Sequence, residues 1–151
     1  MRILVEKSVR RLSMWDENRM IFACRCALGR CPEGTKRMEG DGCTPEGCYR
    51  ICLVKEAGKF GRSLGLSYPN ETDAQLGFSE GRIDRRTFDN ILLAHTENRR
   101  PPWGSPLGGE IYIHEGGSAS DWTQGCIALE SQDMDVIFPF RDAIEQIEIR
   151  A

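Results

Sequence analysis

One histidine and one cysteine stand at the two ends of a polar stretch late in the chain. Residues 114–126 read HEGGSASDWTQGC, which begins with His114 and ends with Cys126. A thiol becomes a useful nucleophile when it is partly exposed and its pKa, about 8.5 in free cysteine, is lowered by a cation or by backbone N–H groups. Histidine is the usual partner, because it accepts the thiol proton and then stabilises the thiolate as an imidazolium. If the loop folds back, the two residues can form such a pair; otherwise a loop thiol lies beside an unrelated histidine.

The residue before the cysteine favours the chemical interpretation. Gly125 has no side chain, so a substrate can approach the thiol of Cys126. Backbone N–H groups at such a position are also free to bind an oxyanion.

A strand must deliver the histidine to this loop. In the segment EIYIH, Ile111 and Ile113 point to one side of a strand, while Tyr112 and His114 point to the other. The apolar pair predicts the core side. We therefore expect His114 to end a strand on the face away from the core.

Short strands dominate the rest of the chain. Residues 2–15 and 19–29 alternate as strands do, and the polar residues 16–18 between them predict a hairpin. Residues 49–54 predict a further strand, and residues 144–150 a final one.

Helical signals are fewer. Asn70 or Thr72 can cap a short helix, apolar residues recur with helical spacing over residues 83–96, and Ser131 can cap a third helix. His95 lies on the second of these helices and is assigned no chemistry. The expected fold class is mostly β (α+β), with two short helices inserted in the middle and one near the C-terminus.

Length and composition exclude several classes of protein. The chain has 151 residues and a net charge of −3, from 20 basic and 23 acidic residues. This length predicts a single domain, residues 1–151, and the charge predicts no nucleic-acid partner. No run approaches the roughly 18 apolar residues of a membrane span, and no signal peptide is recognisable. Either the chain works in the cytoplasm, or an export segment has been removed.

Seven cysteines are many for this length, and six of them fall within residues 24–52. As disulfides these six could pair in about 15 ways and would leave Cys126 free, whereas in a reducing compartment all seven would be thiols. A zinc site is disfavoured because no Cys-x-x-Cys is present. Cys24 and Cys26 share a predicted strand face with Phe22 and Leu28, so we expect them to pack in the core. The six are Cys24, Cys26, Cys31, Cys43, Cys48 and Cys52.

The motifs around the pair resemble a known family. GGEIYIHEGG followed by DWTQGCIAL is similar to the active-site segment of the L,D-transpeptidase catalytic domain, also called the YkuD domain. EGDGCTPEGCY resembles its Gly-Asp-x-x-Thr-Pro-x-Gly-x-Tyr hairpin, and SLGLSYPN and SPLGGEIYIH resemble landmarks of a subfamily with a DWTxGCIAL-type motif. These motifs occur in the expected order between about residue 2 and residue 149. The resemblance implies an L,D-transpeptidase-like β-sandwich.

The resemblance also implies roles for individual residues. Cys126 matches the nucleophile that is acylated, and His114 matches the base. Thr123 fills a Ser/Thr position of the motif, and Gly125 lies where the family forms an oxyanion hole with the Cys126 N–H.

Neighbouring positions match less fully. Asp121 and Trp122 are expected to support the site loop, and Tyr112 to line the pocket. Gln124 replaces a second histidine that many members have, so only one histidine would do acid–base work. Ala128 replaces an arginine or asparagine, which removes a plausible substrate contact.

The activity implied is acyl transfer on peptidoglycan. Cys126 would attack the carbonyl of the third stem-peptide residue and expel the terminal D-alanine. An amine acceptor would then give a 3-3 cross-link, and water would give L,D-carboxypeptidase activity. No cofactor or metal is required, because thiolate, imidazole and backbone N–H groups supply the chemistry.

Family members are commonly acylated by carbapenems, and they work in the cell envelope. Two alternatives stay open from the residues alone. One is a more general amide hydrolase. The other is a non-catalytic domain that binds peptides or metal through the cysteine-rich first third.

Overall fold

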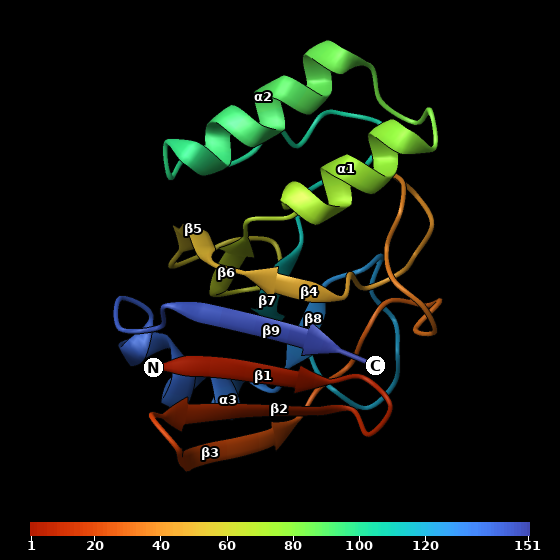
Figure 1. The fold of residues 1–151 in the computed structure, drawn as a ribbon. Helices are drawn as coiled ribbons and strands as arrows, with labels where there is room; N and C mark the ends of the chain where they lie inside the picture. Colours follow the sequence, from red (N-terminus) through yellow and green to blue (C-terminus); the bar gives the residue numbers. More distant parts are fainter.

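Two β-sheets form most of the molecule, which the computed structural model describes over residues 1–151 (Figure 1). Five strands make one sheet, in the order β3-β2-β1-β9-β4, and four make the other, in the order β5-β6-β7-β8. The strands are β1 (Arg2–Glu6), β2 (Arg11–Asp16), β3 (Arg19–Arg25), β4 (Gly47–Tyr49), β5 (Ile51–Lys55), β6 (Ser63–Leu66), β7 (Tyr112–Glu115), β8 (Ile127–Leu129) and β9 (Gln146–Arg150).

The first and last strands of the chain lie side by side in the five-stranded sheet. β1 pairs antiparallel with β2 and parallel with β9, with Ile3 opposite Ile147 and Val5 opposite Ile149. All four of these side chains are almost completely buried. The alternation of apolar and polar residues therefore fixes the register, because a slip by one residue would turn the isoleucines to solvent.

A continuous apolar core joins the two sheets. It contains 20 buried residues drawn from strands of both sheets and from the C-terminal helical segment. Each fully buried Leu, Ile, Met or Val stabilises the fold by about 1.5–3 kcal/mol relative to an exposed side chain. Among its largest members are Ile3, Leu12, Met14, Leu28, Leu64, Leu66, Tyr68, Ile113, Ile127 and Leu129.

The chain passes from one sheet to the other at Arg50. Tyr49, at the end of β4, pairs with Ile147 of β9, whereas Ile51, at the start of β5, pairs with Leu66 of β6. The Arg50 N–H donates to the Ser67 hydroxyl at 3.0 Å instead of to a neighbouring strand. The run 49–54, predicted as one strand, thus divides between the two sheets.

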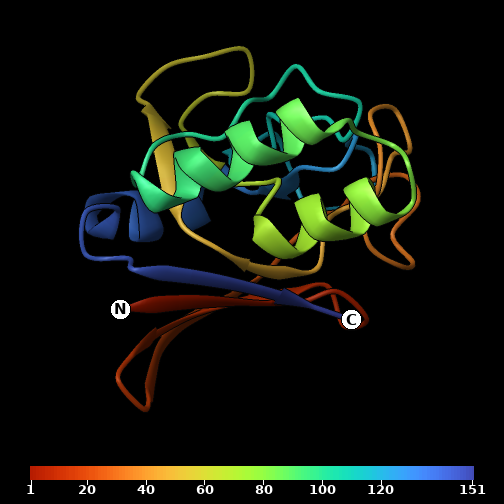
Figure 2. The same ribbon diagram turned by 45° about the horizontal axis from the view of Figure 1, so that its top comes forward.

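Two helices lie next to each other at one end of the molecule (Figures 1 and 2). They are α1 (Glu71–Ser79) and α2 (Arg85–Thr96), and they enclose a second, smaller core of Ala74, Ile83, Ile91 and Leu107. A third helix, α3 (Ser131–Ile137), continues into a 3-10 turn at Phe138–Phe140. None of the helices combines the length and the apolar composition needed to cross a membrane.

The structure confirms the predicted fold class and corrects two boundaries. Residues 2–15 form two strands, because the chain turns at Lys7–Arg10 and Arg10 adopts a φ of +52°. Ser131 is the first residue of α3 and not its cap; the N-cap is Glu130, which makes no side-chain capping bond. Asn70 does cap α1, through a hydrogen bond from the Asp73 N–H at 2.9 Å.

Candidate active site

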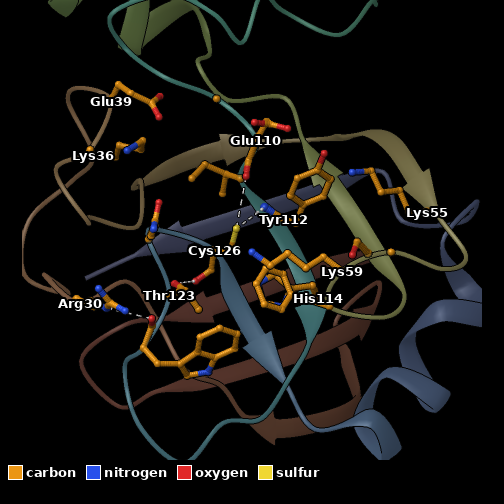
Figure 3. A pocket seen from close by; sticks show the side chains of 18 residues that line it. Arg30, Lys36, Glu39, Lys55, Lys59, Glu110, Tyr112, His114, Thr123 and Cys126 are labelled. Atoms are coloured by element: carbon orange, nitrogen blue, oxygen red, sulfur yellow. Dashed lines mark hydrogen bonds between the residues drawn. The ribbon is translucent and has the colours of Figure 1, made fainter.

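His114 and Cys126 open onto the same cavity (Figure 3). The cavity has a volume of about 490 Å³. Its walls come from β7 and the segment before it, from the segment that precedes β8, from the loop that joins β5 to β6 with the strand ends beside it, and from the loop between β3 and β4. The polar segment between the histidine and the cysteine therefore does fold back, because β7 and β8 are paired in parallel with His114 opposite Ala128.

His114 packs against two aromatic rings that also contact each other. Phe60 stacks on the imidazole at a centroid distance of 4.8 Å, and Trp122 meets it edge-on at 5.6 Å. Only 2% of His114 is exposed. Burial lowers the pKa of the imidazole, against the opposing effect of the Glu115 carbonyl beside it. The resting imidazole is therefore neutral at neutral pH.

The hydrogen bond of that ring fixes its tautomer. His114 Nδ1 lies in hydrogen-bond contact with the Glu115 carbonyl oxygen, and a carbonyl oxygen can only accept. Nδ1 must therefore hold the proton, so Nε2 has a free lone pair. Glu115 is itself held by Arg62, whose backbone N–H donates to the carboxylate at 2.6 Å and whose Nη2 donates at 2.6 Å.

The Cys126 sulfur is held by two backbone groups. Sγ accepts from the Tyr112 N–H at 3.4 Å and donates to the Glu110 carbonyl at 3.4 Å (Figure 3). Burial raises the pKa of the thiol to about 11, although the Tyr112 N–H and Lys36 lower it. No hydrogen bond joins the sulfur to His114, so the resting pair is a thiol and a neutral imidazole and not an ion pair.

Gly125 has a conformation that other residues rarely adopt. Its φ is +134°, and a Cβ there would lie 2.7 Å from the Cys43 carbonyl oxygen. The Gly125 N–H donates to Thr123 Oγ1 at 3.1 Å, and that hydroxyl donates to the Cys126 carbonyl at 2.7 Å. The N–H expected to be free at Gly125 is thus occupied, while the Cys126 N–H has no acceptor within the chain.

Asp121 and Trp122 anchor the segment that precedes the cysteine. The Asp121 carboxylate accepts from Arg10 Nη2 at 2.8 Å and from the Leu28 N–H at 3.0 Å. Burial alone would raise the pKa of Asp121, but these hydrogen bonds outweigh it and hold the pKa below its ordinary value. Trp122 donates from Nε1 to the Gly117 carbonyl at 3.0 Å, which positions its ring beside His114.

Several cavity residues were not anticipated from the sequence. Tyr112 lines the cavity as expected, but Lys55 joins it from the end of β5, and Lys59 and Phe60 from the β5–β6 loop. The signal was present in the segment KEAGKFGR, where Lys59 and Phe60 occur between two glycines in a turn. Nothing in their spacing related them to residues 114–126, because only the pairing of β6 with β7 brings them together.

The remaining cysteines and His95 lie outside this arrangement. All seven cysteines are free thiols, and no group of three or more His, Cys, Asp or Glu side chains is placed to hold a metal ion. Cys26 is completely buried in the core, and Cys24 packs against it, as expected. His95 Nε2 bonds the Pro69 carbonyl at 2.7 Å, which ties α2 to the start of α1.

Comparison with known proteins gave one family and several solved structures. The family model of the L,D-transpeptidase catalytic domain (YkuD) matches residues 1–149. No curated protein matches the chain in sequence.

Three of the solved structures illustrate the similarity. The helical cell shape determining protein Pgp2 from Campylobacter jejuni has a TM-score of 0.66 at 20% identity, with 98% of this chain and 46% of that chain covered. Bd1075 from Bdellovibrio bacteriovorus has a TM-score of 0.54 at 22% identity, covering 99% and 47%. An L,D-transpeptidase from Xylanimonas cellulosilytica has a TM-score of 0.56 at 9% identity, covering 98% and 59%. At these identities the similarity shows a shared fold, and the chain spans about half the length of these proteins.

Proposed function

Because the chain belongs to the L,D-transpeptidase catalytic domain (YkuD) family, we propose that it is a cysteine-dependent acyltransferase that acts on peptidoglycan stem peptides. The observation that supports this most directly is the shared cavity of Cys126 and His114. The thiol is at its wall, and the imidazole presents an unprotonated Nε2 because Nδ1 is committed to Glu115. Residues 1–151 would form the single catalytic domain.

The first half-reaction needs only groups already in the cavity. As the Cys126 sulfur attacks the carbonyl carbon of the third stem-peptide residue, its proton passes to His114 Nε2. The negative charge on the carbonyl oxygen is stabilised by the Cys126 N–H, which has no other acceptor. His114 then gives the proton to the amine of the terminal D-alanine, the C–N bond breaks, and a thioester remains on Cys126.

The second half-reaction decides the product. An amine from a second stem peptide attacks the thioester and gives a 3-3 cross-link, whereas water gives a shortened stem and L,D-carboxypeptidase or amide hydrolase activity. In both cases Cys126 leaves as a thiol with a proton returned by His114. The partners are therefore peptidoglycan stem peptides, as donor and acceptor, and the site of action is the cell envelope.

Product analysis with a purified tetrapeptide stem tests the proposal. We expect release of D-alanine in the presence of the protein, and a cross-linked dimer when an amine acceptor is added. A shortened tripeptide as the only product would assign hydrolysis. Cys126→Ala should abolish both products, while Cys48→Ala, which removes an exposed thiol outside the cavity, should retain them.

A carbapenem provides a second, independent measurement. Incubation should add one drug mass to the intact protein, and the adduct should be lost in Cys126→Ala and kept in Cys48→Ala. Folded protein that forms neither adduct nor product would overturn the proposal in favour of a binding domain.

A further inference from the structure

Lysine is distributed unevenly in this chain. Only four lysines occur among the 20 basic residues, and three of them, Lys36, Lys55 and Lys59, line the cavity. With Arg30 the cavity has four cations, against the two acids Glu39 and Glu110. Positive charge is thus concentrated at this site although the chain as a whole has a net charge of −3. Such a cavity attracts anionic ligands.

Two of the three cavity lysines have no anionic partner. Lys36 is buried and bound, with Nζ donating to Asp41 at 2.9 Å and to the Met38 carbonyl at 3.0 Å. Lys55 and Lys59 are exposed and form no ion pair. Their ammonium groups therefore remain available to a ligand.

Both free ammonium groups lie on the histidine side of the sulfur. Lys55 Nζ lies 4.7 Å from the centre of the Tyr112 ring. Lys59 Nζ lies 5.2 Å from the centre of the Phe60 ring, which stacks on His114. Figure 3 shows Lys36 and Glu39 on the opposite side of the Cys126 sulfur. The wall that holds the proposed acid–base residue therefore has two lysines without an anionic partner, whereas Arg30, which also forms no ion pair, donates from Nε to the Trp122 carbonyl at 3.3 Å.

The proposed proton transfer dictates which part of the substrate lies there. His114 has to protonate the leaving amine, so that nitrogen must face the imidazole. In the expelled D-alanine the carboxylate is attached to the carbon that bears this nitrogen. The carboxylate consequently lies on the His114 side of the cavity, within reach of two flexible lysine side chains.

We propose that Lys55 and Lys59 bind the terminal carboxylate of the expelled residue, so that the site selects donor peptides with a free C-terminus. This inference rests on the proposed function. It assigns a specificity role to the end of β5 and the β5–β6 loop.

The test compares two donors that differ in one group. A tetrapeptide stem with a terminal carboxylate and the same peptide with a terminal carboxamide are assayed for D-alanine or D-alaninamide release. For the unmodified protein we expect kcat/KM to favour the carboxylate by on the order of ten- to a hundredfold, as for a hydrogen bond between charged groups. Lys55→Gln/Lys59→Gln should reduce that ratio to near one, Lys→Arg at both positions should largely restore it, and Arg86→Gln, an exposed α2 cation outside the cavity, should leave it unchanged.

A binding measurement separates failure of this inference from failure of the proposed function. In the Cys126→Ala background, NMR titration with the two peptides should show tighter binding of the carboxylate, and the preference should weaken with added salt and with the two lysine substitutions. If the folded Lys55→Gln/Lys59→Gln variant still prefers the carboxylate peptide as strongly as the unmodified protein, in turnover or in binding, the proposed role of the lysines is wrong. If the unmodified protein releases no product but the Cys126→Ala form shows the lysine-dependent preference, the catalytic proposal fails and the carboxylate site stands.

Discussion

At the scale of single residues, the resting protonation states of the pair determine how the rate should depend on pH. The thiol of Cys126 has its pKa raised to about 11, and the pKa of His114 is lowered by burial. Almost no thiolate therefore exists at neutral pH, so the proposed attack depends on a neutral His114 that takes the proton. We expect carbapenem acylation to be constant around neutral pH and to fall on acidification only below the ordinary histidine pKa of about 6.5.

Removal of that base should change the shape of this profile. His114→Gln should lower the acylation rate at pH 7 by about 10²–10⁴-fold. The variant's rate should then rise with pH toward the thiol pKa of about 11, because hydroxide replaces the imidazole as the base. Stopped-flow acylation over a pH series that extends from acidic to alkaline conditions would measure this, with the folded state checked at each pH. A variant with an unchanged flat profile would show that His114 does not accept the proton.

A second prediction at this scale concerns the backbone conformation of Gly125. Gly125→Ala forces a side chain into a φ of +134° and against the Cys43 carbonyl oxygen at 2.7 Å. We expect a loss of about 1–3 kcal/mol in unfolding free energy from the backbone strain, together with slower acylation because the Cys126 N–H is displaced. Urea unfolding and the carbapenem rate measure the two effects. Gly104→Ala is the control, since a Cβ there meets no atom within 4 Å.

At the scale of elements, the start of α1 couples helix capping to pH. Asp73 accepts from the Asn70 N–H at 2.9 Å and from the Tyr49 hydroxyl at 3.0 Å. Burial nevertheless raises the pKa of Asp73 to about 6, because those two hydrogen bonds only partly offset it. The folded chain therefore binds the Asp73 proton more tightly than the unfolded chain does. Its stabilising effect is complete below the unfolded pKa of about 3.9 and is lost as the pH rises through about 6.

Asp73→Asn should remove this dependence while keeping both contacts through the amide oxygen. Between pH 4.5 and 7.5 the difference in unfolding free energy between variant and parent should shift by about 2 kcal/mol in favour of the variant. Urea titrations at the two pH values measure the difference. A constant difference would mean that Asp73 is ionised throughout, and Asp89→Asn on the exposed face of α2 serves as the matched control.

The elements also show what local sequence can and cannot predict. Asn70 could be named as one of two candidate caps because the capping bond is made within three residues. The turn at Lys7–Arg10 was missed because the residues there alternate like a strand. Its stability comes from distant contacts, such as Lys7 Nζ on the Thr44 carbonyl at 2.9 Å. Such partners lie too far along the chain for a periodicity to reveal them.

At the scale of the whole molecule, one ion pair connects the first sheet to the segment before Cys126. Arg10, in the turn between β1 and β2, binds Asp121 through Nη2 at 2.8 Å and Nε at 3.0 Å. Arg10→Met should cost about 1–3 kcal/mol of unfolding free energy and leave a partly buried carboxylate without its cation. Acylation should slow as well, because Asp121 lies five residues before Cys126.

A double-mutant cycle measures the coupling. If the pair acts as described, Arg10→Met and Asp121→Asn together should cost less than the sum of the single changes, by about 0.5–3 kcal/mol. Additive losses would show that the two residues act separately. Arg85→Met, which breaks an exposed pair with Asp89, should change stability by less than about 1 kcal/mol.

Much of the candidate site was predictable because its motif is contiguous. His114, Thr123, Gly125 and Cys126 fall within 13 positions of sequence. The two lysines and Phe60 were not predictable as site residues, because they lie far before His114 in the sequence and reach the cavity only through the pairing of β6 with β7. The occupied Gly125 N–H was also beyond reach, since it depends on the rotamer of Thr123. Sequence thus predicted which side chains of residues 114–126 are candidates for the chemistry, and the fold was needed to show the cavity walls around them.

The parallel pairing of β1 with β9 has a mechanical consequence. Both strands run in the same direction, and the chain enters at the start of β1 and leaves at the end of β9 (Figure 1). Opposite forces on the two chain ends therefore load every β1–β9 hydrogen bond at once, in shear, and cannot peel them apart one by one. A domain pulled at these two ends would resist extension until this whole strand pair ruptures.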